Sequence, residues 1–172
     1  MNKYYNKFYN VLKLIEENLY NGRGTYLKNC KRSIQPDNLS CGVHAVASIL
    51  QYYDKEVSTP ELITLLGTNQ DGTDTEPMIN ALSSFDLNIE INETSSPRDI
   101  IDSVRSGYPM LITVDDWEHW VVIYGFSDEG IFLLDSNRKN FRCHWHFNTF
   151  MDRWDDNWLA IIKPRQNMQQ EN

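Results

Sequence analysis

The stretch QPDNLSCGVHAVASILQYY, residues 35–53, decides the fold. After a polar loop, apolar residues such as Val43, Val46 and Leu50 follow at helical spacing on several sides. We therefore expect a buried helix that begins at Cys41. A helix N-terminus carries partial positive charge and lowers the pKa of a thiol placed there. Most free cysteines are small buried hydrophobes, so this position alone does not identify a nucleophile.

Gln35 stands six residues before Cys41. A side-chain amide near the sulfur could donate to the oxyanion of a tetrahedral intermediate, with the Cys41 backbone N–H as the second donor. Gly42 would leave room for a substrate backbone beside the sulfur. Taken alone, a glutamine at this position is more often a solvated loop residue.

A second stretch, HWVVIYGFSDEGIFLLD at residues 119–135, supplies a base and an acid. His119 opens one predicted strand and Asp135 ends the next. If the two strands form a hairpin, the end of the second returns beside the start of the first. The carboxylate could then hold one imidazole nitrogen so that the other faces the sulfur. Together with Cys41 and Gln35, these residues form the four parts of a thiol acyl-transfer site.

Other residues compete for roles at this site. His44 is a rival base, but it lies on the same predicted helix as Cys41, so we interpret it as a packed or supporting residue. Trp117 and Trp120 flank the predicted base and could line a substrate groove or cap the core. Strand alternation would place Cys143 opposite His144 and His146, so we expect no metal site there and no cofactor.

The remaining sequence predicts α+β structure, with helices first and a mostly antiparallel sheet after them. Thr59-Pro60 and Ser96-Pro97 are strong helix starts, and Gly67 and Gly107 are good stops. Further short helices are expected near 76–85 and 147–153. Strands are expected at Leu87–Ile91 and in the stretches PMLITV, HWVVIYGF, GIFLLD, FRCHWH and NWLAIIK.

The N-terminal segment predicts an amphipathic helix over about residues 3–20. Tyr4, Phe8, Leu12, Ile15 and Leu19 share one face, which we expect to pack on the core. A docking helix or a removable pro-segment is the alternative. We divide the chain into this helix and a loop at 1–33, a domain at 34–163 and a polar tail at 164–172.

Composition narrows the classes of function. The chain has 172 residues, enough for one domain, and its net charge of −8 argues against a nucleic-acid partner. No signal peptide or apolar run long enough for a membrane span is evident. The three cysteines lack a disulfide spacing, which favours a reducing, cytoplasmic setting. Export by a signal-less route would leave no mark, and the oligomeric state is open.

Several motifs resemble the papain-like cysteine peptidases, in particular the bacterial peptidases that remove double-glycine leaders from bacteriocin precursors. They are Gln35-x5-Cys41-Gly42, Leu50-x-Tyr52-Tyr53, Val57-Ser58-x-x-Glu61-Leu62 and the strand from His119 to Gly125. The resemblance covers about residues 34–162. It departs at Ser40, where the family usually has Asp, and at Ser136, where it usually has Pro.

The resemblance implies a papain-like fold and a cysteine peptidase that cleaves a peptide or isopeptide bond in a peptide or protein substrate. Cys41-x-x-His44 with Glu118-His119-Trp120 also resembles the Josephin deubiquitinases, which is a second possibility. A catalytically idle papain-like module that binds peptides is a third, and a secreted effector that cuts a host protein is a fourth.

Overall fold

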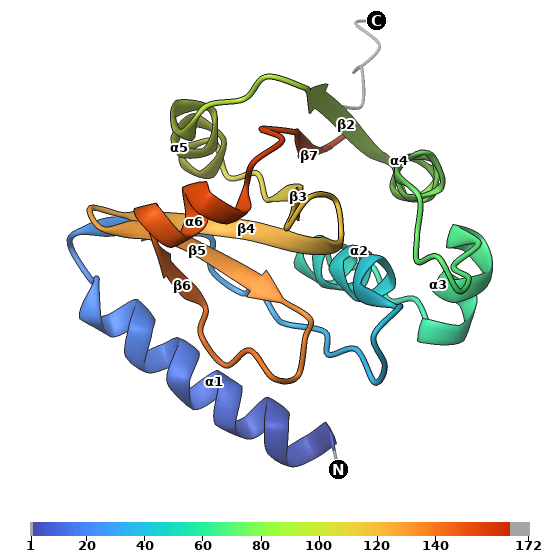
Figure 1. The fold of residues 1–172 in the computed structure, drawn as a ribbon, viewed down its shortest axis with the longest axis horizontal. Helices are drawn as coiled ribbons and strands as arrows, with labels where there is room; N and C mark the ends of the chain where they lie inside the picture. The colour runs from blue at the N-terminus through green and yellow to red at the C-terminus, as the bar shows by residue number, and fades with distance from the viewer. Residues whose placement is uncertain (1, 166–172) are drawn as a thin grey trace, which may run out of the picture.

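The computed structural model describes residues 2–165 and contains helices and strands in the order that the sequence predicts, with one added strand (Figure 1). The helices are α1 (Asn2–Leu19), α2 (Cys41–Tyr52), α3 (Thr59–Leu66), α4 (Thr75–Ser84), α5 (Pro97–Arg105) and α6 (Phe147–Arg153). The strands are β1 (Gly24–Tyr26), β2 (Leu87–Asn92), β3 (Met110–Val114), β4 (His119–Ser127), β5 (Gly130–Asp135), β6 (His144–His146) and β7 (Leu159–Pro164).

The strands form one antiparallel sheet in the order β2-β7-β3-β4-β5-β6. β4 is its centre, because β5 pairs with one edge while β3 and β1 pair with successive parts of the other. A register shift between Ile123 and Gly125 divides these parts. A Cβ on Gly125 would lie 2.5 Å from the Cβ of Tyr26, so only glycine lets β1 approach here. The predicted α+β class with a mostly antiparallel sheet is confirmed.

Local sequence signals set the helix ends. Ser58 caps α3 by accepting a hydrogen bond from the Glu61 N–H, and Gly67 ends it in the left-handed conformation. Ser96 and Asp99 form a capping box at the start of α5. Helix α2 is buried over its first ten residues and packs on β4 at the core.

Two local predictions were wrong. The segment from 24 to 26 was expected to be loop but forms β1, because β4 extends past the end of β3 and offers free backbone partners. The stretch FRCHWH was expected to be a strand throughout, yet only His144–His146 pairs with β5. The predicted polar tail begins at the last residue of β7, Pro164, and most of it, residues 166–172, lies outside the described part.

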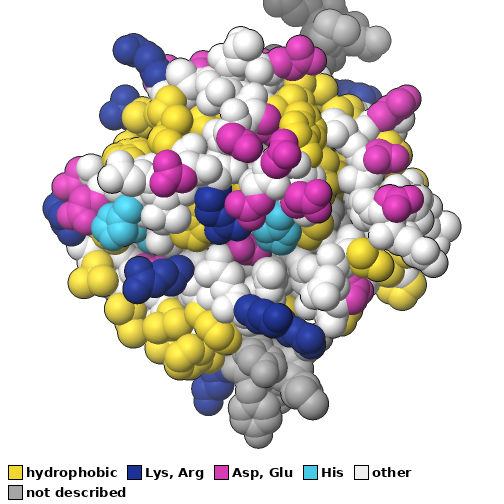
Figure 2. All heavy atoms as spheres, in the orientation of Figure 1, with side chains coloured by type: hydrophobic (Ala, Val, Ile, Leu, Met, Phe, Trp, Pro, Cys, Tyr) yellow, Lys and Arg dark blue, Asp and Glu magenta, His cyan; other side chains and the backbone are white. Residues whose placement is uncertain are grey.

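The orientation of α1 also differs from the prediction. Phe8, Ile15 and Leu19 are 55%, 48% and 63% exposed and Leu12 is half-buried, so most of the expected apolar face points to solvent, while the Tyr4 side chain is outside the described part. Figure 2 shows hydrophobic side chains gathered over α1 on this side of the molecule. Tyr9, fully buried, lies on the inner side of the helix.

Polar groups explain this orientation. The Glu16 carboxylate accepts hydrogen bonds from the backbone N–H groups of Cys143 and His144 at 2.8 and 3.0 Å. These groups lie at β6, the last strand of the sheet, and a buried N–H without a partner is costly. Tyr20, just after α1, stacks on the His144 ring at 4.1 Å. The helix therefore turns its polar side inward.

Candidate active site

Cys41 is the first residue of α2 and is 7% exposed. The loop before it is closed by Asp37, whose Oδ1 accepts hydrogen bonds from the Leu39 N–H and from the N–H and hydroxyl of Ser40, at 2.8 to 2.9 Å. This turn directs the chain into the helix, and the thiol lies where the partial positive charge of the helix is greatest.

His119 and Asp135 come together through the hairpin of β4 and β5. Val121 pairs with Asp135, so the first residue of β4 lies close to the last residue of β5. His119 Nε2 is 2.7 Å from Asp135 Oδ1. The His119 side chain also interacts with the Cys41 thiol, which lowers the pKa of the thiol and raises that of the imidazole. Because Nε2 is engaged by Asp135, Nδ1 is the ring nitrogen that remains for the sulfur.

The electrostatics of the three groups favour an ion pair. Burial raises the pKa of the Cys41 thiol, but hydrogen bonds from His119 and from the Trp120 backbone outweigh it and leave the pKa lowered. Burial lowers the pKa of His119, whereas hydrogen bonds to Asp135 and Cys41 raise it to about 10. Burial raises the pKa of Asp135, yet the contact with His119 holds it below its ordinary value.

The turn from β3 to β4 fixes the base from the other side. Asp115, Asp116 and Trp117 all have positive φ, between 56° and 67°. Residues other than glycine adopt this backbone conformation only at a cost in energy. The Arg153 guanidinium holds Asp115 through both carboxylate oxygens, and the Asp115 N–H donates to the Arg153 carbonyl at 2.8 Å. The end of α6 thus holds the strained turn that precedes His119.

Gln35 is 4% exposed and its amide is oriented at both ends. The Ser136 hydroxyl donates to Gln35 Oε1 at 2.6 Å, and Gln35 Nε2 donates to the Asp37 carbonyl at 2.7 Å. The Gln35 N–H donates to the Ser136 carbonyl at 3.0 Å, which ties the loop before α2 to the end of β5. An amide nitrogen has two hydrogens, so one is left for a further acceptor.

The family model described as "Peptidase C39 family" matches residues 29–167 of this chain. The chain belongs to the Peptidase C39 family. The predicted resemblance to bacteriocin-processing peptidases and the assignment as a cysteine peptidase are thereby confirmed. Mesentericin transport/processing ATP-binding protein MesD of Leuconostoc mesenteroides is 27% identical over 120 residues, which are 66% of this chain and 16% of that protein. The chain therefore spans about a sixth of the length of this curated relative.

Solved structures share the fold of this C39 peptidase. The peptidase domain of Streptococcus ComA, a bi-functional ABC transporter involved in quorum sensing, superposes with a TM-score of 0.69 at 20% identity. The superposition covers 78% of this chain and 98% of that one. A double glycine motif protease from an AMS/PCAT transporter, solved in complex with the leader peptide, has a TM-score of 0.67 at 20% identity over 81% of this chain and 98% of its own.

Gly42 in this C39 peptidase meets protein rather than open space. A Cβ at this position would lie 2.7 Å from the Cβ of Thr73 and 3.2 Å from Met78 Sδ. The glycine lets α2 approach α4 and the loop before it. Its predicted role in substrate binding stays a prediction, and packing accounts for glycine at this position.

The two tryptophans of the site have different environments. Trp120 is buried, and its indole N–H donates to the Thr73 carbonyl at 3.0 Å. Trp117 is 47% exposed and packs against Trp120 and Trp158, with ring centroids 6.3 and 5.7 Å apart. Only Trp117 therefore offers a large aromatic surface to a substrate next to His119.

The other candidates have partners of their own. His44 is buried, with Nδ1 2.7 Å from the Ser33 hydroxyl, and burial lowers its pKa. The Cys143 thiol donates to Glu16 at 3.0 Å, and His144 Nε2 lies 2.8 Å from the Ser127 hydroxyl. Among residues 2–165, no group of three or more His, Cys, Asp or Glu side chains could hold a metal ion.

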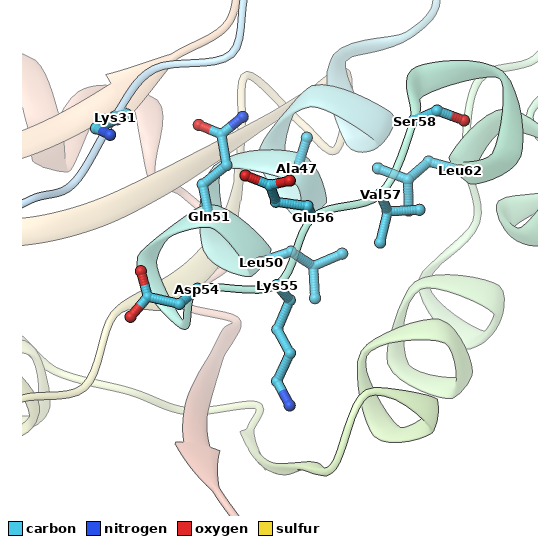
Figure 3. Close-up of a pocket in the computed structure, with 10 residues that line it drawn as sticks. All are labelled: Lys31, Ala47, Leu50, Gln51, Asp54, Lys55, Glu56, Val57, Ser58 and Leu62. Atoms are coloured by element: carbon cyan, nitrogen blue, oxygen red, sulfur yellow. The ribbon is translucent and has the colours of Figure 1, made fainter.

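A large pocket lies at the opposite end of α2 from Cys41 (Figure 3). It has a volume of about 700 Å³ and is lined by Lys31, Ala47, Leu50, Gln51, Asp54, Lys55, Glu56, Val57, Ser58 and Leu62. At 1.5 Å of rise per residue, Leu50 is roughly 14 Å along the helix from Cys41. The pocket is therefore separate from the reacting groups.

Sequence reasoning missed the residues that orient the site. Ser136 replaces the usual proline and holds Gln35, while Asp37 closes the turn before Cys41. Asp37-x-x-Ser40 carries a recognisable turn signal. The pairing of Arg153 with Asp115 joins positions 38 residues apart and leaves no local signal. No helix in the described part of the chain is long and apolar enough to cross a membrane.

Proposed function

We propose that this chain hydrolyses a peptide bond with Cys41 as nucleophile, His119 as general base and acid, Asp135 as orienting acid and Gln35 in the oxyanion hole. The observation that carries the proposal is the position of His119, whose Nε2 lies 2.7 Å from Asp135 Oδ1 and whose pKa is raised by its contacts with Asp135 and Cys41. Gly42 and Trp117 are proposed to border the bound substrate.

The reaction follows from this arrangement. His119 takes the Cys41 proton, and the thiolate attacks the carbonyl carbon of the scissile bond. The oxyanion accepts hydrogen bonds from the free Gln35 amide hydrogen and the Cys41 N–H. As the intermediate collapses, His119 gives its proton to the leaving amine. Water, deprotonated by His119, then attacks the thioester and releases the acid. Every proton passes through His119, so no cofactor is required.

The substrate we propose is a precursor peptide with a leader that ends in two glycines. Support comes from the family, from the transport/processing names of the curated relatives, and from the similar protease solved with a leader peptide. We also propose a cytoplasmic location, because Cys30, Cys41 and Cys143 are all free and the reaction needs a reduced thiol.

The first test is the rate at which iodoacetamide alkylates each cysteine from pH 4 to 9, read by peptide mass spectrometry. Cys41 should react well below its ordinary pKa of about 8.5 and lose this advantage in His119→Ala. Cys30 and Cys143 are internal controls, because burial raises the pKa of both, that of Cys30 to about 12. An ordinary Cys41 in both proteins would favour an idle peptide-binding module.

The second test concerns the substrate. A leader peptide with a Gly-Gly site should be cut after the second glycine, and replacement of both glycines by valine should abolish cleavage because branched side chains need more room at the sulfur. Equal cleavage of both peptides would reject the double-glycine specificity while leaving the thiol mechanism standing.

A further inference from the structure

The outer oxygen of the Asp135 carboxylate has a partner of its own. Asp135 is 2% exposed, and its Oδ1 faces His119 and accepts the Asn137 N–H at 2.8 Å. Its Oδ2 accepts a hydrogen bond from the Asn140 side-chain amide, also at 2.8 Å. A buried carboxylate needs hydrogen-bond donors on both oxygens, and Asn140 supplies the donor for Oδ2.

The Asn140 amide can present only its NH₂ group to Asp135. Its Oδ1 accepts the Arg142 N–H at 3.2 Å, so its nitrogen is turned toward the carboxylate. The Asn140 backbone N–H donates to the Asn137 carbonyl at 3.0 Å and closes the loop after β5. The side chain is therefore oriented before any substrate arrives.

Arg32 holds this loop from the side of α1. Its guanidinium donates to the Asn140 carbonyl at 2.5 Å and to the Asn137 carbonyl at 3.4 Å. The group is 6% exposed and lies 4.1 Å from the centre of the Tyr9 ring. A planar guanidinium holds its donors in a fixed fork and can engage two carbonyls in a defined geometry, whereas a lysine ammonium is a compact point charge with freely rotating donors.

We propose that Asn140 is a positioning residue for the thiol reaction, which fixes the Asp135 carboxylate against His119, and that Arg32 holds the loop that carries it. The inference rests on the proposed function, because Asp135 matters to catalysis only if His119 is the base. The Asn140 side chain hydrogen-bonds to Asp135 and to the Arg142 N–H, so it acts on the reaction through the orientation of Asp135.

The physical reason is the freedom of the carboxylate. Without Asn140, Oδ2 would be buried without this donor, and the carboxylate would be freer to rotate away from His119. A carboxylate turned away from the ring supports the imidazolium less well, so the thiolate–imidazolium pair would form at higher pH. The charged and titratable groups around Asp135 are His119 on β4, Tyr9 on α1, Arg32 before α2, Asp115 in the β3–β4 turn and Arg153 on α6.

The test compares Asn140→Ala and Asn140→Asp with Lys139→Ala, an exposed neighbour in the same loop. Each full-length variant is measured for kcat/KM on the leader peptide and for the pH midpoint of Cys41 alkylation. We expect Asn140→Ala to lower kcat/KM by roughly 10-fold to 100-fold, mostly in kcat, and to move the midpoint upward. Lys139→Ala should match the wild type.

Asn140→Asp keeps the size of the side chain but replaces the donor with a second carboxylate next to Asp135. We expect it to be at least as impaired as Asn140→Ala. Arg32→Lys should cause a smaller loss in the same direction. Thermal melting identifies any variant that fails to fold, in which case Arg32→Lys carries the test.

A ¹⁵N NMR titration of His119 makes the two proposals distinguishable. The pKa and tautomer of His119 should change in Asn140→Ala even if the wild type cleaves no peptide. If wild-type Cys41 is unreactive but this change occurs, the proposed function fails and the positioning role stands. If His119 titrates identically in the wild type, Asn140→Ala and Asn140→Asp, the positioning role is overturned.

Discussion

Helices α1 and α2 both have a clear helical pattern, yet they relate to the core in opposite ways. Helix α2 is buried over its first ten residues, so nearly every side of it contacts protein. Helix α1 exposes Phe8, Ile15 and Leu19 and turns Tyr9 and Glu16 toward the sheet. A helix that is apolar on all sides can only be buried, whereas an amphipathic helix can be held by its polar face when that face satisfies a strand edge.

The largest effect should come from the start of α2. Cys41→Ala removes the proposed nucleophile and should reduce peptide cleavage by at least about 10⁴-fold, with the fold intact. Cys30→Ala and Cys143→Ala are matched controls, because both cysteines are buried but lie away from His119 and should retain activity. Cleavage by the Cys41→Ala protein at the wild-type rate would reject the assignment of this helix end as the site.

The loop that leads into α2 should show the next effect. Gln35→Ala removes one proposed oxyanion donor and should lower kcat by about 100-fold to 1000-fold, measured by steady-state kinetics. It also breaks the contact with the Ser136 hydroxyl, so melting temperature should be measured in parallel. Gln51→Ala, an exposed glutamine at the other end of α2, is the control. A small change in kcat would remove Gln35 from the oxyanion hole.

The packing at the start of α2 should not tolerate a larger residue in place of Gly42. Gly42→Ala places a Cβ 2.7 Å from the Thr73 Cβ, and we expect a loss of about 1–3 kcal/mol in the free energy of unfolding. Chemical denaturation measures this loss. An unchanged denaturation midpoint would mean that α2 lies farther from Thr73 than described. Packing would then not explain the glycine, and its proposed role beside the substrate would remain.

The smallest effect should come from the outer face of α1. Leu19→Gln changes a side chain that is 63% exposed, so the free energy of unfolding should stay within about 0.5 kcal/mol of the wild type. The matched control is Leu50→Gln in α2, which is 1% exposed and should be strongly destabilising because it buries an amide. Similar losses of unfolding free energy in both variants would show that α1 packs its apolar face against the core.

The sequence by itself determined the helix that begins at Cys41, the strand that begins at His119 and the strand that ends at Asp135. These follow from short-range physics, namely apolar periodicity, capping residues and turn residues, which act within a few positions. The antiparallel sheet could be expected because strands follow one another closely in the second half of the chain. The hairpin geometry then brings His119 and Asp135 together.

Only the tertiary structure decided which face of α1 points inward, why residue 42 is glycine, and how the site is held in place. Glu16 meets β6 across 127 residues, Arg32 meets Asn140 across 108, and Gln35 meets Ser136 across 101. Each contact depends on a single polar atom that finds a buried partner far along the chain. Such pairs leave no periodic trace in the sequence, because their spacing is set by the packing of the whole domain.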